Sequence, residues 1–230
     1  MSAALEPEPE WQLEWDEGAV GRAITPIRLR SYRVAARGDL HGALRLYDWN
    51  AVASAAVLVT VAMVEVIVRN AMDSQLTAWA ARRGEGSWFD TIPVDGRALA
   101  DLERACRAAE SSTGGNDFHG KAVAELGFGF WRCLVAQRYL TPLWVPALNQ
   151  AFPNGYRDIR ERRLRVERNL AGLVTVRNRA AHHEPIHCRD LLADLRAAVE
   201  VATWVDVDAG AWVAARSPLE NVVRRRPRTA

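Results

Sequence analysis

The residues of this chain that are best suited to chemistry lie close together in its last third, in Arg177-Asn178 and in His182. A neutral imidazole such as that of His182 can take a proton from a hydroxyl group near neutral pH. The guanidinium of Arg177 offers a planar set of donors to a phosphate and to the charge that develops on it. The Asn178 amide can orient a sugar or the imidazole. Together these side chains could catalyse the cleavage of RNA without a metal ion.

A long helix is expected to carry these residues. Apolar side chains recur at helical spacing from about Asp158 onward. The helix should end at Glu184, because a residue that precedes a proline is disfavoured in the α region. His182 and the neighbouring His183 are therefore predicted on its last turn, where the negative end of the helix dipole favours a protonated imidazole.

Helical spacing also limits which side chains can meet. Asn178 and His182 are four residues apart and share a face, and Arg179 and His183 do so as well. Arg177 and His182 are five apart, which places them about 140° from each other around the helix. They can act on one ligand only if the arginine bends across or a second chain completes the site. The spacing therefore suggests a dimer.

A purely structural interpretation competes with the catalytic one. In it, His182 and His183 cap the C-terminus of the helix, and Arg177 pairs with a carboxylate on a neighbouring helix. Spacing alone favours this interpretation, because an arginine followed five positions later by a histidine is a short and unspecific pattern.

Glu65 and Arg69 form a second polar pair, inside an apolar stretch of the chain. They are four residues apart with the acid first, which is the favourable order for a pair on a helix surface. Because Glu65 is flanked by valine and isoleucine, we expect it to be partly buried and to need a positive partner. Arg69 or Arg177 could supply that charge. In the second case Glu65 would orient Arg177 or His182 and support the site.

The segment from Arg177 to His182 matches the Arg-x(4–6)-His signature of the HEPN superfamily, including the polar residue after the arginine. Its continuation, Arg-Asn-Arg-x-x-His-His-Glu-Pro-Ile, resembles the Abi-like (abortive infection) branch of that superfamily. Three further segments fit the same branch in order and extend the resemblance over roughly residues 25–205: Ala43–Asn50, Glu65–Ala71 and Val123–Trp131. Four ordered segments are far more specific than one short motif.

This resemblance implies an up-and-down helical bundle and a homodimer that brings two Arg-x4-His motifs to one cleft. It also implies a metal-independent endoribonuclease of a bacterial phage-defence or toxin-type system, with no cofactor, acting on RNA in the cytoplasm. His182 would be the general base or acid, Arg177 the phosphate contact and Asn178 the orienting group. Arg179 and His183 would support them.

One departure from the family bears on partners. Some HEPN toxins carry a tyrosine two residues after the histidine, which a nucleotidyltransferase antitoxin modifies, whereas this chain has Glu184. An antitoxin protein is a candidate partner, but one of that kind is not supported. The alternative function is a non-catalytic RNA- or protein-binding helical module, for which the helical pattern and the mild net charge suffice.

Composition bounds the architecture. The chain has 230 residues, of which 49% are hydrophobic, and a formal net charge of +2, so we expect one sizeable core and no global basic field. An acidic segment at residues 1–24 and a basic tail at residues 217–230 are predicted to be disordered, on either side of a single helical domain at residues 25–216. Cys106, Cys133 and Cys188 form no Cys-x-x-Cys pair and indicate buried or free thiols.

The stretch from residue 40 to about residue 83 contains no proline, which predicts helix throughout, with a break or cap at Asp48-Trp49-Asn50. Residues 51–68 are almost all apolar and just long enough to span a membrane. Because Glu65 interrupts this run and no basic flank precedes it, the centre of a helical bundle is the favoured location, and no membrane association is expected.

No segment shows the two-residue period of a β-strand, so we expect an all-α chain with about four or five long helices and additional short helices. The arginine run at residues 157–168 is either a solvated helix face or a phosphate track. His119, beside Lys121, is a candidate for a further phosphate contact. The aromatic side chains at residues 128–131 are expected to pack into the core.

Overall fold

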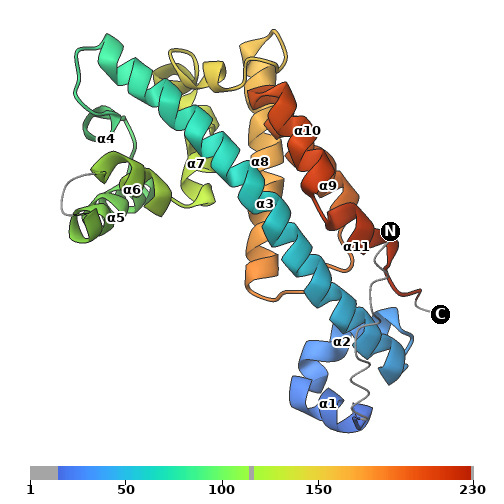
Figure 1. Ribbon diagram of the computed structural model, residues 1–230. Helices are drawn as coiled ribbons and strands as arrows, with labels where there is room; N and C mark the ends of the chain where they lie inside the picture. Colours follow the sequence, from blue (N-terminus) through green and yellow to red (C-terminus); the bar gives the residue numbers. More distant parts are fainter. Residues whose placement is uncertain (1–14, 114–116, 229–230) are drawn as a thin grey trace, which may run out of the picture. The chain divides into compact units, whose positions relative to one another are not determined.

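The computed structural model describes residues 15–113 and 117–228. Within them every regular element is a helix, which confirms the predicted all-α class. In chain order the helices are α1 (Glu17–Ile24), α2 (Pro26–Ala35), α3 (Leu40–Arg82), α4 (Trp88–Thr91), α5 (Gly96–Thr113), α6 (Phe118–Glu125), α7 (Phe128–Leu134), η1 (Gln137–Tyr139), η2 (Leu140–Trp144), η3 (Leu148–Ala151), α8 (Ile159–Ala181), α9 (Leu191–Val205), α10 (Val207–Arg216) and α11 (Leu219–Arg224) (Figure 1).

Contacts divide the chain into two compact units, with the boundary between Trp49 and Asn50. Among the described residues, 15–49 and 226–228 form the smaller unit, and those between Asn50 and Arg225 form the larger one. This division differs from the single domain at residues 25–216 that the composition predicts. α3 itself is continuous, so the predicted break at residues 48–50 is wrong. Asn50 does not cap a helix there, because its Oδ1 accepts a hydrogen bond of 2.8 Å from the Ile186 N–H.

The smaller unit begins with α1, in a segment that the composition predicts to be disordered through residue 24. That prediction is wrong for residues 17–24, because the Asp16 side chain caps the helix and accepts a hydrogen bond of 2.7 Å from the Gly18 N–H. α2 begins at Pro26, with Thr25 as the N-cap, because a proline fits the first turn of a helix. Residues 1–14, the rest of the acidic segment, lie outside the described residues.

The core of the larger unit is built mainly by α3 and α8. Both helices bury aliphatic side chains at helical spacing, among them Val57, Val61, Val64, Val68, Met72 and Leu76 of α3 and Val166, Leu170, Leu173 and Val176 of α8. α9 packs against α8, and α10 and α11 pack against α9. α5 contacts α6 and α7, and α7 contacts α8. The helix that carries Arg177 is therefore supported by α7, α9 and η3.

An aromatic cluster joins α4, α6 and α7. Trp88 is fully buried and contacts Phe130 and Trp131, which pack into the core as predicted. The Trp88 indole N–H donates to the Asp73 carboxylate at 2.7 Å, and the same carboxylate is hydrogen-bonded to His119 Nε2 at 2.9 Å. His119 is thus paired with an acid of the fold, which argues against the predicted phosphate contact.

Three of the six arginines at residues 157–168 are engaged in the fold. Arg162 donates to two backbone carbonyl groups, and Arg165 pairs with Glu200 of α9 at 2.8 Å. Arg163 is buried and hydrogen-bonded on two sides. These contacts engage Arg162, Arg163 and Arg165 in the fold, whereas Arg157, Arg160 and Arg168 are exposed.

The C-terminal segment is helical over Leu219–Arg224, although residues 217–230 are predicted to form a disordered tail. Leu219 is buried and anchors α11. The hydroxyl groups of Thr60 in α3 and Ser217 are hydrogen-bonded at 2.7 Å, which fixes the start of this segment. The prediction is therefore wrong for residues 219–224, and residues 229–230 lie outside the described part of the chain.

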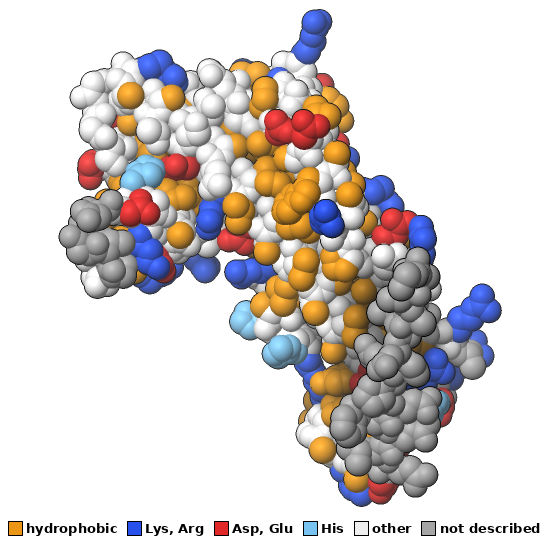
Figure 2. Space-filling model, in the orientation of Figure 1, with side chains coloured by type: hydrophobic (Ala, Val, Ile, Leu, Met, Phe, Trp, Pro, Cys, Tyr) orange, Lys and Arg blue, Asp and Glu red, His pale blue; other side chains and the backbone are white. Residues whose placement is uncertain are grey.

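The side of α3 that faces away from the core is also apolar. Val52, Val59 and Val66 are 55%, 50% and 42% exposed and recur every seven residues, with Ala55 and Ala62 between them. Figure 2 shows hydrophobic side chains along this helix. α3 contains a window with mean hydropathy 2.4 that is long and apolar enough to cross a membrane, and 44% of that window is buried inside the chain. An exposed apolar stripe of this kind indicates a surface that meets another apolar surface.

Candidate functional site

α8 ends earlier than the position of Pro185 predicts. Its last residue is Ala181 and not Glu184. His182 is the C-cap, and His183 adopts a left-handed backbone conformation with φ 57°. The Glu184 N–H then reaches back to the carbonyl oxygen of Arg179 at 2.8 Å, which is the Schellman arrangement. The two histidines therefore follow the last helical turn instead of lying on it.

The backbone of His183 stores strain that a glycine would relieve. A residue with a Cβ atom pays about 1 kcal/mol in this left-handed region, whereas glycine does not. We expect His183→Gly to raise the free energy of unfolding by about 1 kcal/mol. His182→Gly, at a position with negative φ, should lower it by about 0.5–1 kcal/mol because only the unfolded chain gains freedom. Urea denaturation of both variants measures the difference, and equal effects of the two would contradict the strain.

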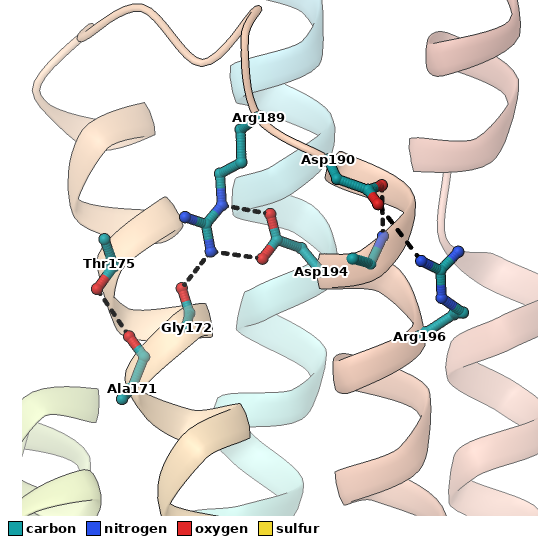
Figure 3. A network of polar contacts seen from close by, with 8 residues as sticks. Ala171, Gly172, Thr175, Arg189, Asp190, Asp194 and Arg196 are labelled. Atoms are coloured by element: carbon teal, nitrogen blue, oxygen red, sulfur yellow. Dashed lines mark hydrogen bonds and ion pairs between the residues drawn. The ribbon is translucent and has the colours of Figure 1, made fainter.

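The connection after the histidines is held against α8 by a charged network (Figure 3). Both nitrogens of the Arg189 fork bind the Asp194 carboxylate, at 2.6 and 2.7 Å, and one also donates to the Gly172 carbonyl oxygen at 3.2 Å. Asp190 caps α9 by accepting the Ala193 N–H at 2.9 Å. This network ties the start of α9 to α8 and holds the end of the connection at Arg189 and Asp190.

Arg177 and Asn178 lie in the wall of a cleft of about 200 Å³. The Arg177 Nη1 donates to Asn178 Oδ1 at 3.2 Å, so these two predicted site residues are in contact. The cleft is lined by α5, by the segment around the start of α7 and by α8, with Arg97, Asp101, Arg104, Glu125, Leu126, Gly127, Phe128, Gly129, Phe130, Val174, Arg177 and Asn178.

Glu65 approaches the same region from α3. Burial raises the pKa of Glu65, while the charges of Arg177 and Arg69 and a hydrogen bond from the Phe128 N–H act in the opposite direction. Arg69 itself donates to Asn70 at 3.4 Å. Among the described residues, no carboxylate oxygen lies at ion-pair distance from Arg177. The guanidinium of Arg177 interacts electrostatically with the Glu65 carboxylate, but over a distance longer than that of an ion pair. Its guanidinium therefore keeps donors for a ligand, and the predicted structural pairing with a carboxylate is not formed there.

The histidines are not part of this cleft. His182 and His183 are both exposed, and neither lines it. Arg179 pairs with Glu184 at 3.1 Å, on the exposed end of the helix. Within one chain the structure thus groups Arg177 and Asn178 near Glu65 but leaves the histidines and Arg179 in a separate, solvent-facing group.

The cleft also contains residues that the motif does not predict. Arg97 and Arg104 of α5 are held by Asp101, at 3.9 and 2.6 Å. Gly127 and Gly129 form part of the wall, and both are exposed. The sequence pattern of Arg97, Asp101 and Arg104 could have indicated this group. An acid with one arginine four residues before it and another three residues after it forms one charged helix face.

The described cleft offers guanidinium, amide and carboxylate chemistry. Within the described residues, no three side chains of His, Cys, Asp or Glu gather in a way that could hold a metal ion. Cys106, Cys133 and Cys188 are free thiols, as predicted. Arginine is thus the main functional group that this site presents to a ligand.

Comparison of the chain with protein-family models, with curated proteins and with solved structures gave no match in any of the three. What the chain does must therefore be inferred from its own residues and their geometry.

Proposed function

We propose that this chain is a metal-independent endoribonuclease of a bacterial phage-defence (abortive infection) or toxin-type system, with an HEPN-like bundle and a cytoplasmic location. Arg177 contacts the scissile phosphate, Asn178 orients the ribose, and His182 transfers the proton. Single-stranded RNA is the preferred substrate, because its backbone and bases are accessible. An antitoxin protein is a candidate partner.

The position of Arg177 is the observation that carries this proposal. Its guanidinium lines a cleft together with Arg97 and Arg104, and no carboxylate among the described residues neutralises it at ion-pair distance. A planar fork of donors that is left unpaired in a basic cleft suits a phosphodiester, which offers two oxygens in matching geometry. Structural arginines, in contrast, are usually paired.

The proposed reaction needs a base, an acid and a group that stabilises charge. A neutral imidazole takes the proton from the ribose 2′-hydroxyl, the 2′-oxygen forms a bond to phosphorus, and the bond from phosphorus to the 5′-oxygen breaks. The leaving 5′-oxygen receives a proton from a protonated imidazole. Arg177 stabilises the charge on the phosphate oxygens. The products are a 2′,3′-cyclic phosphate and a 5′-hydroxyl end.

This reaction requires two copies of the chain, because His182 does not line the cleft that holds Arg177. The exposed apolar stripe of α3 supports a homodimer. Its seven-residue repeat at Val52, Val59 and Val66 suits packing against the same stripe of a second helix. A two-fold axis of this kind makes it feasible for Arg177 of one copy to meet His182 of the other.

A non-catalytic RNA- or protein-binding module is the second candidate. The exposed position of His182, outside the arginine cleft, favours it. Such a module would bind RNA through the cleft and release it uncut.

Purified protein incubated with single-stranded RNA in EDTA tests the proposal. We expect fragments that end in 2′,3′-cyclic phosphate, and we expect Arg177→Ala to cut about 100-fold to 1,000-fold more slowly, the usual loss when one charge-stabilising donor is removed. Arg168→Ala is the matched control, because Arg168 is exposed on the same helix and does not line the cleft. Binding by the wild-type protein without any cleavage would instead establish the second candidate.

A further inference from the structure

The cleft at Arg177 continues into a second cavity of about 310 Å³. The two cavities share the lining residues Arg97, Asp101, Gly129, Val174 and Asn178. The second one extends away from Arg177 along α7 and η1, where it is lined by Arg132, Cys133 and Arg138. An extended ligand that enters the cleft at Arg177 therefore has a path past these arginines.

Positive charge predominates along this path. The guanidinium groups of the two cavities come from Arg97, Arg104, Arg132, Arg138 and Arg177, and their carboxylates come from Asp101 and Glu125. Five positive charges thus face two negative ones over both linings, which favours an anion with several charges over a neutral ligand.

The arginines of the second cavity are partly held in place. Arg138 lies over the Tyr139 ring at 4.8 Å and donates to Cys133 Sγ at 2.9 Å. Arg132 is exposed and lies six residues earlier in the chain, in α7. A side chain that is already ordered loses less conformational entropy when it binds a ligand.

Gly129 leaves room in the wall that both cavities share. It is exposed, and a Cβ atom placed there would meet no other atom within 4 Å. No packing against the protein therefore requires a glycine at this position. The bare backbone keeps the passage between the two cavities open to a ligand.

We infer that the second cavity is a subsite for the backbone of single-stranded RNA beside the scissile bond, with Arg132 and Arg138 each binding a phosphate. This inference rests on the proposed function and extends it. It also moves the RNA path from the arginine run at the start of α8, where several side chains are engaged in the fold, to α7.

The salt dependence of binding tests the inference. The probe is a fluorescent 2′-O-methyl oligouridylate, which lacks the attacking hydroxyl and is not cut. Arg132→Ala with Arg138→Ala should reduce the slope of log affinity against log salt by about 1.4, because each lost contact to a single strand contributes about 0.7. Arg160→Ala with Arg168→Ala removes the same charge from exposed positions of α8 and should leave the slope unchanged.

A steric variant tests the same path without a change in charge. The leucine side chain of Gly129→Leu extends from the shared wall into the passage between the two cavities. We expect this variant to bind the probe about tenfold or more weakly, because the added side chain occupies the space of the ligand. Gly86→Leu is the control, since a Cβ atom at Gly86 also meets nothing within 4 Å and Gly86 lines neither cavity. Unfolding midpoints of both variants verify that they fold.

The outcomes separate the subsite from the function. Suppose that the wild-type protein cuts RNA, but that the double variant Arg132→Ala with Arg138→Ala and the variant Gly129→Leu both bind the probe as the wild-type protein does. The assignment of the subsite is then wrong, and the proposed nuclease function stands. If the α8 control lowers the slope instead, the RNA path follows α8 and the subsite is likewise wrong. If the wild-type protein neither binds nor cuts RNA, both proposals fail together.

Discussion

His182→Ala is expected to slow RNA cleavage by about 100-fold to 10,000-fold, which is the usual contribution of a general acid or base. His182 is exposed at the C-cap of α8, so the variant should fold as the wild-type protein does. RNA binding should change little, because the arginine cleft that we assign to binding is untouched. The measurement is the single-turnover rate constant at saturating RNA in EDTA. His41→Ala removes an exposed histidine of the smaller unit and should cut at the wild-type rate.

A mixture of two inactive variants tests whether the site is shared between copies. In a composite site, Arg177→Ala and His182→Ala chains form mixed dimers in which one of the two sites has an intact arginine and an intact histidine. After subunit exchange, an equal mixture should recover about a quarter of the wild-type activity, since half of the dimers are mixed and each has one intact site. A site that lies within one chain would show no recovery.

One result would contradict the assignment of His182, and another would contradict a site shared between two copies. Cleavage by His182→Ala at the wild-type rate would show that no proton passes through this imidazole. A monomer in solution that cleaves at the wild-type rate would show that the α3 stripe does not bring a second copy to the site. In the second case Arg177 would have to meet its proton donor within one chain.

Local signals in the sequence account for the starts of two helices. Thr25-Pro26 marks the start of α2, and the helical spacing traced from about Asp158 agrees with a start of α8 at Ile159, where Asp158 is the N-cap. Such starts are readable because capping needs only a side chain and its own next turn. The end of α8 was not predictable from the proline rule. His183 adopts a left-handed conformation that local preference disfavours, and the helix therefore ends three residues early.

The cleft could be predicted only in part. Arg177 and Asn178 stand out because they are adjacent in a recognisable motif, but Arg97 joins them through the packing of α5 against α7, which no local pattern encodes. Asn50 illustrates the same limit. It resembles a helix cap in sequence, whereas its side chain binds the Ile186 backbone far along the chain.

Arg163→Ala is expected to lower the free energy of unfolding by about 3–5 kcal/mol, the usual cost of removing one partner from a buried charged network. Arg163 is only 3% exposed. One end of its guanidinium donates to the Val135 carbonyl oxygen at 2.9 Å and to Glu167 at 2.6 Å, and the other donates to Gln137 at 2.7 Å. Alanine would leave a cavity and would strip these acceptors of their donor. Because Val135 caps the end of α7, the loss should also loosen the helix that carries Gly129.

The conservative variant separates the charge from the fork. Arg163→Lys keeps the positive charge but can donate hydrogen bonds to fewer of the three acceptors. We therefore expect it to lower the free energy of unfolding by less than Arg163→Ala does. It also removes the Arg163 Nε–H, a buried donor that has no partner, which offsets part of the loss. Arg160→Ala, exposed on the same helix, should change stability by less than about 0.5 kcal/mol. If urea denaturation gave Arg163→Ala the same small effect as Arg160→Ala, the contact between α8 and the end of α7 would not be what holds this wall of the cleft.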